Sequence, residues 1–378
     1  MSIIDDEGNL FGVVNVIDAL AVLLILAVLV AGVAVVGILW SDGEPETRYA
    51  TIDLGEQPDY IADRIEPGDR MAVEGHDQNV TITDVYVTST PDDDDNADAG
   101  PSIVVRAAVD GELVENDHGR LEFTHAGERF RAGNELTLDM LEYTATGEVT
   151  TIDSEGEDLN TQTTTVLLES TLPASTADAI QVDDEFGVAG NTFATVTEVR
   201  TYAVGDDQRR VQVGLELETI TRGSIPHFAG NSVAIGSDLS ITAGEYAFTG
   251  DVIRIGSLQE AGDIDETTVE LKLENVNPDL ADSLEAGMTE TERGETVATV
   301  QSVESQPAEV VLESEDGNIY LREHPKNMDV RLVVDVQTVE TESGLRFKGD
   351  SLREGNTIHL DFGSISVDGT VTTIDHDD

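Results

Sequence analysis

Three sequence landmarks recur in the same order along this 378-residue chain, and this repetition constrains the fold more than any other feature. The first landmark is Ala-Asp-x-Ile/Leu, with a proline three or four residues ahead of it. Because proline is favoured in the first turn of a helix, the landmark predicts a short helix in each copy. The copies are Pro58 with Ala62–Ile65, Pro173 with Ala177–Ile180, and Pro278 with Ala281–Leu284.

The second landmark is a strand that follows each predicted helix and carries unevenly spaced apolar residues. The spacing is two residues and then three, whereas a strand with one buried face keeps a constant spacing of two. One inserted residue accounts for the change, so we expect a β-bulge at the same place in every copy. The apolar residues are Val80, Ile82 and Val85, then Ala194, Val196 and Val199, and then Ala298, Val300 and Val303.

The third landmark is a spaced pair of glycines near the end of each copy, followed by a closing strand. Such a pair fits a hairpin turn and then a second turn that enters the last strand. The glycine pairs are Gly127 and Gly133, Gly230 and Gly236, and Gly349 and Gly355; the closing strands are expected at 147–152, 250–255 and 369–374.

Together the landmarks predict a mainly β chain built from tandem domains. The repeat period is roughly 105 to 115 residues, which is the size of a domain rather than of a solenoid repeat. We expect each copy to form a small β-barrel or β-sandwich with one short helix. The predicted domains are repeat 1 at 47–156, repeat 2 at 157–262 and repeat 3 at 263–378.

An uninterrupted apolar segment at 19–40 precedes the repeats and contains no charged residue. About 20 apolar residues are enough for a helix to cross the hydrocarbon core of a bilayer. We therefore predict a single transmembrane helix at 19–40, an N-terminal tail at 1–18 and a short polar linker at 41–46. A cleaved signal peptide is the alternative. Because the tail contains no Lys or Arg, we favour an uncleaved anchor.

The charge of the chain is strongly negative, with 77 acidic and 20 basic residues and a formal net charge of -57. Such repulsion opposes folding at low ionic strength, but the hydrophobic fraction of 39% is sufficient for packed cores. Molar salt shortens the Debye length to about 3 Å and screens the repulsion, so the composition predicts a halophile. Nucleic acid is excluded as a partner because its binding requires a basic surface. Cysteine is absent, which excludes disulfides and thiolate chemistry.

The N-terminal segment carries Ile4-Asp5, Gly8-Asn9-Leu10-Phe11-Gly12 and Asn15-Val16-Ile17-Asp18 directly before the apolar run. In this pattern the chain resembles the domain-of-unknown-function family numbered 4330. The resemblance implies one membrane helix followed by an extracytoplasmic β-region, which ordinarily occurs once in the family. Three copies depart from that pattern, and so does the lack of a basic residue before the helix. Since the family has no established activity, the resemblance implies architecture and location only.

The search for chemistry yields no catalytic, cofactor-binding or metal-binding residue. No histidine pair has the spacing of a zinc site, and we expect each histidine to lie in a solvated loop. The acidic segment 92–98 does not have the glycine and glutamate positions of an EF-hand, so weak cation binding stays an open alternative there. The histidines are His76, His118, His125, His227, His324, His359 and His376.

These observations favour a membrane-anchored, non-enzymatic cell-envelope protein with a structural, scaffolding or binding role. Its expected partners are the lipid bilayer through residues 19–40 and either envelope proteins or further copies of the chain. Arg48, the first basic residue after the anchor, favours a cytoplasmic placement of the domains, whereas a short tail before the anchor favours an extracellular one, which we expect. The alternatives are a cytoplasm-facing scaffold of a shape or secretion complex and an envelope hydrolase that uses an Asp/Glu pair.

Overall fold

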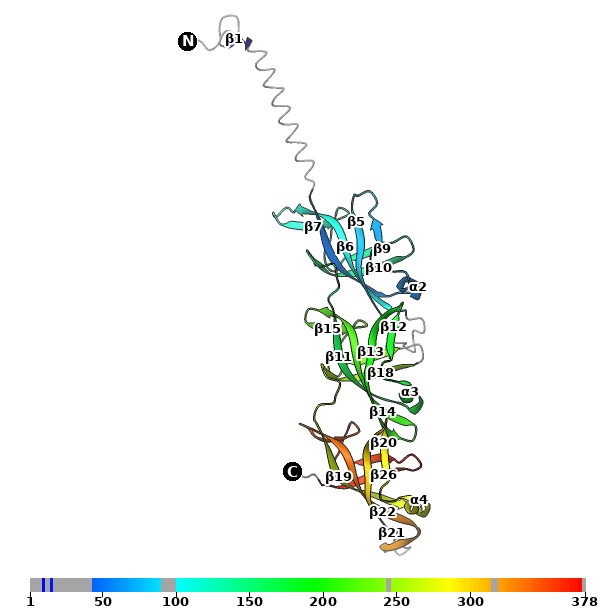
Figure 1. Cartoon of the computed structure of the whole chain (residues 1–378). Coiled ribbons are helices and arrows are strands. Elements are labelled where there is room, and N and C mark those ends of the chain that lie inside the picture. The colour runs from blue at the N-terminus through cyan, green and yellow to red at the C-terminus, as the bar shows by residue number, and fades with distance from the viewer. Residues whose placement is uncertain are drawn as a thin grey trace.

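Three eight-stranded antiparallel sheets follow one another in the computed structural model, which describes residues 9–10, 14–15, 43–89, 100–242, 246–313 and 319–375. We call them unit 1 (residues 44–153), unit 2 (161–255) and unit 3 (263–375). Figure 1 shows the units stacked end to end, with unit 2 between unit 1 and unit 3. The prediction of a mainly β chain with tandem repeats is confirmed, and each sheet curves into a half-barrel.

The strand bounds correspond from unit to unit. Unit 1 contains β3 (Glu44–Glu56), β4 (Arg70–Ala72), β5 (Asn79–Thr88), β6 (Ser102–Glu115), β7 (Leu121–His125), β8 (Glu128–Arg129), β9 (Glu135–Asp139) and β10 (Thr144–Asp153). Unit 2 contains β11 (Thr161–Pro173), β12 (Glu185–Val188), β13 (Asn191–Gly205), β14 (Gln208–Arg222), β15 (Ile225–Phe228), β16 (Asn231–Ser232), β17 (Asp238–Thr242) and β18 (Ala247–Ile255). Unit 3 contains β19 (Asp263–Val276), β20 (Thr289–Glu292), β21 (Glu295–Glu313), β22 (Ile319–Thr341), β23 (Gly344–Phe347), β24 (Asp350–Ser351), β25 (Thr357–Asp361) and β26 (Ser366–Asp375).

The strand order is the same in all three sheets. In unit 1 it is β4-β5-β6-β3-β10-β9, with the β7–β8 hairpin branching from β6, and the strands of units 2 and 3 repeat this order. A further two-stranded pair, β1 (Asn9–Leu10) with β2 (Val14–Asn15), lies before the units. In this strand order β3 lies beside β10, so the first and last long strands of a unit are hydrogen-bonded neighbours.

One short helix follows the first strand of each unit, as the proline landmark predicts. The helices are α2 (Asp59–Ala62), α3 (Ala174–Ala179) and α4 (Pro278–Ser283). Pro58 and Pro173 directly precede α2 and α3, whereas Pro278 is the first residue of α4. The Asn277 side chain caps α4 by accepting a hydrogen bond of 2.9 Å from the backbone N–H of Asp279.

The bulge predicted in the second strand of each copy is present in all three units. The register shifts between Ile82 and Asp84, between Val196 and Glu198, and between Val300 and Ser302. The predicted glycine turns are also confirmed, since Gly133, Gly236 and Gly355 adopt left-handed φ values of 86°, 82° and 85°.

Each unit has a hydrophobic core of its own. Along β14, every second residue from Val211 to Leu217 has a fully buried apolar side chain, and these side chains lie on one face of the strand. Aromatic packing adds to the core of unit 2, where Phe193 and Phe228 lie with their ring centroids 5.8 Å apart. The curved face of each sheet therefore encloses a separate core.

Several sequence predictions differ from the structure or lie outside its described residues. Strand β3 begins at Glu44, so the sheet starts within the segment expected to be a linker. The predicted transmembrane helix at 19–40 and the acidic segment 92–98 lie outside the described residues. Among the residues that are described, no helix has the length and apolar character needed to span a membrane.

Candidate functional site

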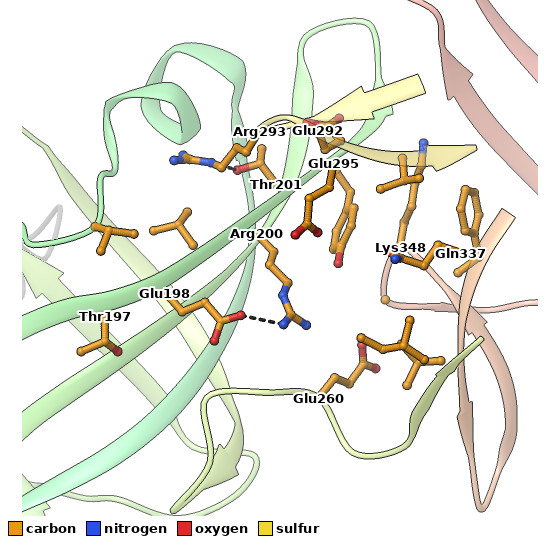
Figure 2. Close-up of a pocket in the computed structure, with 18 residues that line it drawn as sticks. Thr197, Glu198, Arg200, Thr201, Glu260, Glu292, Arg293, Glu295, Gln337 and Lys348 are labelled. Atoms are coloured by element: carbon orange, nitrogen blue, oxygen red, sulfur yellow. Dashed lines mark hydrogen bonds and ion pairs between the residues drawn. The ribbon is translucent and has the colours of Figure 1, made fainter. Parts of the chain in front are cut away.

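A polar cavity of about 420 Å³ lies where unit 2 meets unit 3. Figure 2 shows charged side chains from both units pointing toward it. We call the contact between units 2 and 3 the polar junction. The charged residues that line the cavity are Glu198, Arg200, Glu260, Glu292, Arg293, Glu295 and Lys348.

The centre of the polar junction is a buried ion pair. The Lys348 Nζ lies 2.5 Å from the Glu290 Oε1, and the two side chains are 5% and 1% exposed. The same Nζ donates to the backbone carbonyls of Ala203 in unit 2, at 3.1 Å, and His359 in unit 3, at 2.8 Å. The ammonium group therefore satisfies acceptors on both sides of the junction. A buried charge requires such acceptors, whereas the second carboxylate oxygen of Glu290, Oε2, is buried without a hydrogen-bond partner among the described residues.

The pair occupies positions that are apolar in the other two units. Lys348 precedes a turn glycine at the place held by Ala126 and Ala229, and all three residues have φ near 50°. Glu290 pairs with Ala298 as Phe186 pairs with Ala194 and as Met71 pairs with Val80. Unit 3 has therefore exchanged two small or apolar residues for a lysine and a glutamate.

Two neighbouring side chains of unit 3 bind backbone groups of unit 2. The Glu292 Oε1 accepts a hydrogen bond of 2.9 Å from the Ala203 N–H. The Arg293 guanidinium donates to the carbonyls of Ala177 and Ile180, at 3.1 Å and 2.8 Å. Ala177 lies in α3 and Ile180 follows its last residue, so the cation occupies the C-terminal end of that helix, where carbonyls lack helical partners.

Further ion pairs surround this centre. The Arg210 Nη1 lies 2.7 Å from a carboxylate oxygen of Asp350 in unit 3, and Arg346 of unit 3 pairs with Glu260 in the linker. The remaining pairs are Arg200 with Glu198 at 2.6 Å and Arg209 with Asp361 at 3.6 Å.

Burial shifts the proton equilibria of the central residues. It raises the pKa of Glu290 to about 7, although the nearby Lys348 acts in the opposite direction. Burial also raises the pKa of Glu292. It lowers the pKa of Lys348, although the negative charge of Glu290 acts to raise it. The carboxylates of Glu290, Glu292 and Glu260 therefore face Lys348, the Ala203 N–H and Arg346, and these contacts connect unit 2, the second linker and unit 3.

The contact between units 1 and 2, which we call the apolar junction, has an apolar centre, although one partly exposed ion pair, Arg222 with Asp53 at 2.7 Å, also joins these units. Tyr86, Val104, Leu159 and Ile220 form a buried cluster across it. The Tyr86 hydroxyl donates to the Glu218 carbonyl at 2.6 Å, and Val188 of unit 2 packs against the core of unit 1. Val188 corresponds in register to Glu292, because each is the last residue before its hairpin turn.

A cation also joins the first linker to unit 1. Arg106, which is 5% exposed, donates to the Gly156 carbonyl at 3.0 Å and pairs with Asp153 at 3.0 Å. Its counterpart in unit 2 is Gly214, and a side chain added there would collide with Leu258 of the second linker. The linkers therefore pack against the same strand position with different chemistry.

The prediction that each histidine lies in a solvated loop is wrong for four of them, because His125, His227, His324 and His359 lie in strands β7, β15, β22 and β25. His125 is 7% exposed, and its Nδ1 lies 2.7 Å from the Asp110 carbonyl. The His359 Nδ1 lies 2.8 Å from Asp368, and its side chain is 10% exposed. Among the described residues, no group of three or more His, Asp or Glu side chains could hold a metal ion.

The polar junction was not identified from the sequence, although a signal for it exists. Lys348 is one of three lysines in the chain, and it interrupts the repeat where the other copies have alanine. A scarce charged residue at a repeat position that is otherwise small indicates a contact peculiar to that copy. The corresponding signal for Glu290 is a glutamate in place of Met71 and Phe186.

The family model for DUF4330, a domain of unknown function, matches residues 1–153 and 256–375. The chain belongs to this family. The matched segments contain units 1 and 3, while unit 2 lies in the gap between them even though its strand order is the same. The comparison with curated proteins and the comparison with solved structures return no match.

Proposed function

We propose that the chain is a membrane-anchored, non-enzymatic protein of the cell envelope of a halophile, and that its units form a rod that holds its distal end away from the bilayer. The observation that carries this proposal is the direct bonding between adjacent units at both junctions. Backbone and side-chain groups of adjacent units are bonded directly at both, and Figure 1 shows the units in a row. Such contacts oppose bending between units, which suits a spacer or scaffold.

Two sequence features support the location. The apolar segment 19–40 has the length of a transmembrane helix and lies just before unit 1. The charge of -57 suits folding in concentrated salt, where surface repulsion is screened. The engagement of the junction carboxylates with cations and N–H groups supports a structural role over hydrolysis by an Asp/Glu pair.

The test is fractionation and protease accessibility of the full chain in a halophilic host. We expect the protein in the membrane fraction, resistant to alkaline extraction, and we expect protease added to intact cells to digest the units. A variant that lacks residues 19–40 is the matched control and should leave the membrane fraction. Protection of the units in intact cells would instead support the cytoplasm-facing scaffold, and release by alkali would overturn the anchor.

A further inference from the structure

One turn of unit 1 is longer than its counterparts in the other units. In the β6–β7 hairpin, residues 116–120 lie between Glu115 and Leu121, which form the last strand pair. The equivalent hairpins have only residues 223–224 in unit 2 and 342–343 in unit 3 at this place. Because the repeat fixes the fold of a unit, an enlargement in one copy indicates a contact that the other copies do not make.

The enlarged turn, which we call the proximal turn (residues 116–121), lies at the end of unit 1 that the chain enters first. Glu44, the first residue of β3, pairs with Leu113 in β6, and the β6–β7 hairpin continues beyond this pair to Glu115. Two further strand residues lengthen the hairpin by about 7 Å. Figure 1 shows β7 at the end of unit 1 that faces away from unit 2. The proximal turn therefore lies on the side from which the chain arrives.

The connection between the predicted anchor and unit 1 is short. Glu44 follows residue 40, the last of the predicted anchor, by four residues, which span at most about 14 Å. The polar headgroup layer outside the hydrocarbon core of a bilayer is about 5 to 8 Å thick on each side. Since the hairpin extends beyond Glu44 on this side, a unit that stands upright on the membrane brings the proximal turn into the headgroup layer.

The proximal turn carries a cation and an apolar side chain that suit this layer. Leu121 is 66% exposed. The adjacent Arg120 is exposed, and its guanidinium has no ion pair or hydrogen bond among the described residues. Asn116 holds the turn in shape, because its Oδ1 accepts hydrogen bonds of 3.0 Å from the N–H groups of His118 and Arg120. A guanidinium binds phosphate through charge-assisted hydrogen bonds, and a neighbouring leucine is stabilised at the membrane interface.

The equivalent turn of unit 2 binds an anionic group of the unit that precedes it. Arg222, at the start of that turn, pairs with Asp53 of unit 1 at 2.7 Å. Ile225, at its end, is 50% exposed, so a cation and an exposed apolar residue occur together there too. Unit 3 has Thr341 and Gly344 at these positions. Unit 1 is preceded by the predicted anchor, so the corresponding anionic group on its side is the phosphate of a lipid.

Acidic side chains also surround the proximal turn and decide under which conditions it can meet a lipid. Glu115 and Asp117 flank it, whereas Glu122 is engaged by Arg129 at 3.2 Å and by the Asn116 amide at 2.7 Å. The other acidic side chains at this end of the unit are Glu44, Glu46, Glu74, Asp77, Glu112 and Glu128. These carboxylates repel anionic lipid at low ionic strength. Molar salt shortens the Debye length to about 3 Å, so that direct contacts such as that of a guanidinium with a phosphate dominate.

We propose that the proximal turn is a lipid-contacting site, at which the Arg120 guanidinium binds a phospholipid phosphate and Leu121 lies among the headgroups. The proposal rests on the proposed membrane anchor. Anchor and turn together attach unit 1 to the bilayer at two points, which restricts tilting about the short connection at 41–43. The rod of units is therefore held upright on the membrane.

The test uses the absence of cysteine from the native chain. Full-length His118→Cys is labelled with a nitroxide and reconstituted in phosphatidylglycerol nanodiscs in molar potassium chloride. The matched control is the same label at Ser224→Cys, an exposed position in the equivalent turn of unit 2. Collisions with a neutral, water-soluble nickel chelate should be roughly threefold rarer at residue 118, because the headgroup layer excludes the chelate.

The two ways in which this experiment can fail are distinguishable. Equal collision rates at the two labels, in chains that elute with the nanodiscs, would overturn the lipid contact and leave the anchor intact. Elution of the chain apart from the nanodiscs would overturn the anchor itself, and the contact with it.

A second set of variants identifies the side chains that make the contact. Arg120→Gln with Leu121→Ser, added to the His118→Cys chain, should raise the collision rate to that of the unit 2 label. Arg254→Gln with Ile255→Ser is the control, because it makes the same changes in β18 of unit 2 and should leave the rate at residue 118 unchanged. A rate that stays low after the Arg120 and Leu121 changes would contradict the roles assigned to these residues.

Discussion

The polar and apolar junctions join units of the same fold, but the centre of one is a buried ion pair and the centre of the other is an apolar cluster. At the apolar junction Val188 packs against the core of the preceding unit, and at the polar junction the corresponding Glu292 binds a backbone N–H. Apolar contacts are tolerant of small displacements, whereas the hydrogen bonds of a buried ion pair require a defined geometry. The comparison indicates that the repeated core fixes the fold of a unit, while a few residues outside that pattern fix how it meets its neighbour.

The largest effect is expected from breaking the buried pair on one side. Lys348→Ala leaves Glu290 buried without its cation, which should lower the free energy of unfolding of unit 3 by about 3 to 5 kcal/mol. Hydrogen exchange followed by mass spectrometry reports each unit separately and is the suitable measurement. The matched control is Lys348→Ala with Glu290→Met, which recreates the Met71 and Ala126 combination of unit 1 and should recover most of the loss. A double variant as unstable as the single one would show that the loss does not come from an unpaired charge.

The next largest effect is expected in the pH dependence of stability, which should distinguish the polar junction from the apolar junction. Burial raises the pKa of Glu290 from its ordinary value of 4.5, which it has in the unfolded chain, to about 7, so the folded state binds the extra proton between these values. Its contribution is therefore fully present below pH 4.5 and is lost as pH rises toward 7, by up to about 3 kcal/mol.

This pH effect is measured as a difference in molar salt, because many other carboxylates titrate in the same range. The stability of unit 3 in the native chain is compared with that of the Glu290→Met, Lys348→Ala chain between pH 4.5 and 7. The difference should decline with rising pH for unit 3 and stay constant for unit 1. Parallel pH profiles for the two chains would argue against a titrating pair.

A smaller effect is expected from Arg293. Arg293→Ala leaves the Ala177 and Ile180 carbonyls at the end of α3 without their donor, at a cost of about 2 kcal/mol. Small-angle scattering should show a broader distribution of lengths because unit 3 is held less firmly. Arg254→Ala, in β18 of unit 2, is the control for loss of one positive charge and should leave the scattering profile unchanged.

The smallest effect is expected at the apolar junction. Tyr86→Phe removes the hydrogen bond to the Glu218 carbonyl but keeps the ring in its cluster, so the loss should be about 1 kcal/mol. Hydrogen exchange near Glu218 should increase slightly, with little change in overall length. A loss as large as that from Lys348→Ala would contradict the assignment of this junction as predominantly apolar.

Much of the fold could be predicted from the sequence because repetition separates signal from chance. A single proline or glycine is ambiguous, but Pro58, Pro173 and Pro278 at equivalent places mark three helices, and the shifted spacing after Ile82 recurs as a bulge. The strand order did not follow from local spacing, since neighbouring strands such as β3 and β10 are far apart in sequence.

The polar junction and the long β21–β22 hairpin could not be predicted in the same way, because both depend on departures from the repeat. Lys348 gains its role from Glu290 and Ala203, which lie 58 and 145 residues away and approach it only after two units have folded and met. The length of the β21–β22 hairpin depends on five strand pairs beyond Pro307, whereas one pair follows the corresponding bulge in unit 2.

The pairing of the first and last long strands within each sheet has a consequence for how such a chain can grow. Asp153 at the end of β10 lies opposite Tyr49 near the start of β3, so the polypeptide enters and leaves unit 1 at nearly the same point. A module with adjacent entry and exit can be duplicated or excised without rethreading its neighbours. The family match stops at residue 153 and resumes at 256, as it would if one such module had been copied into the gene between two others.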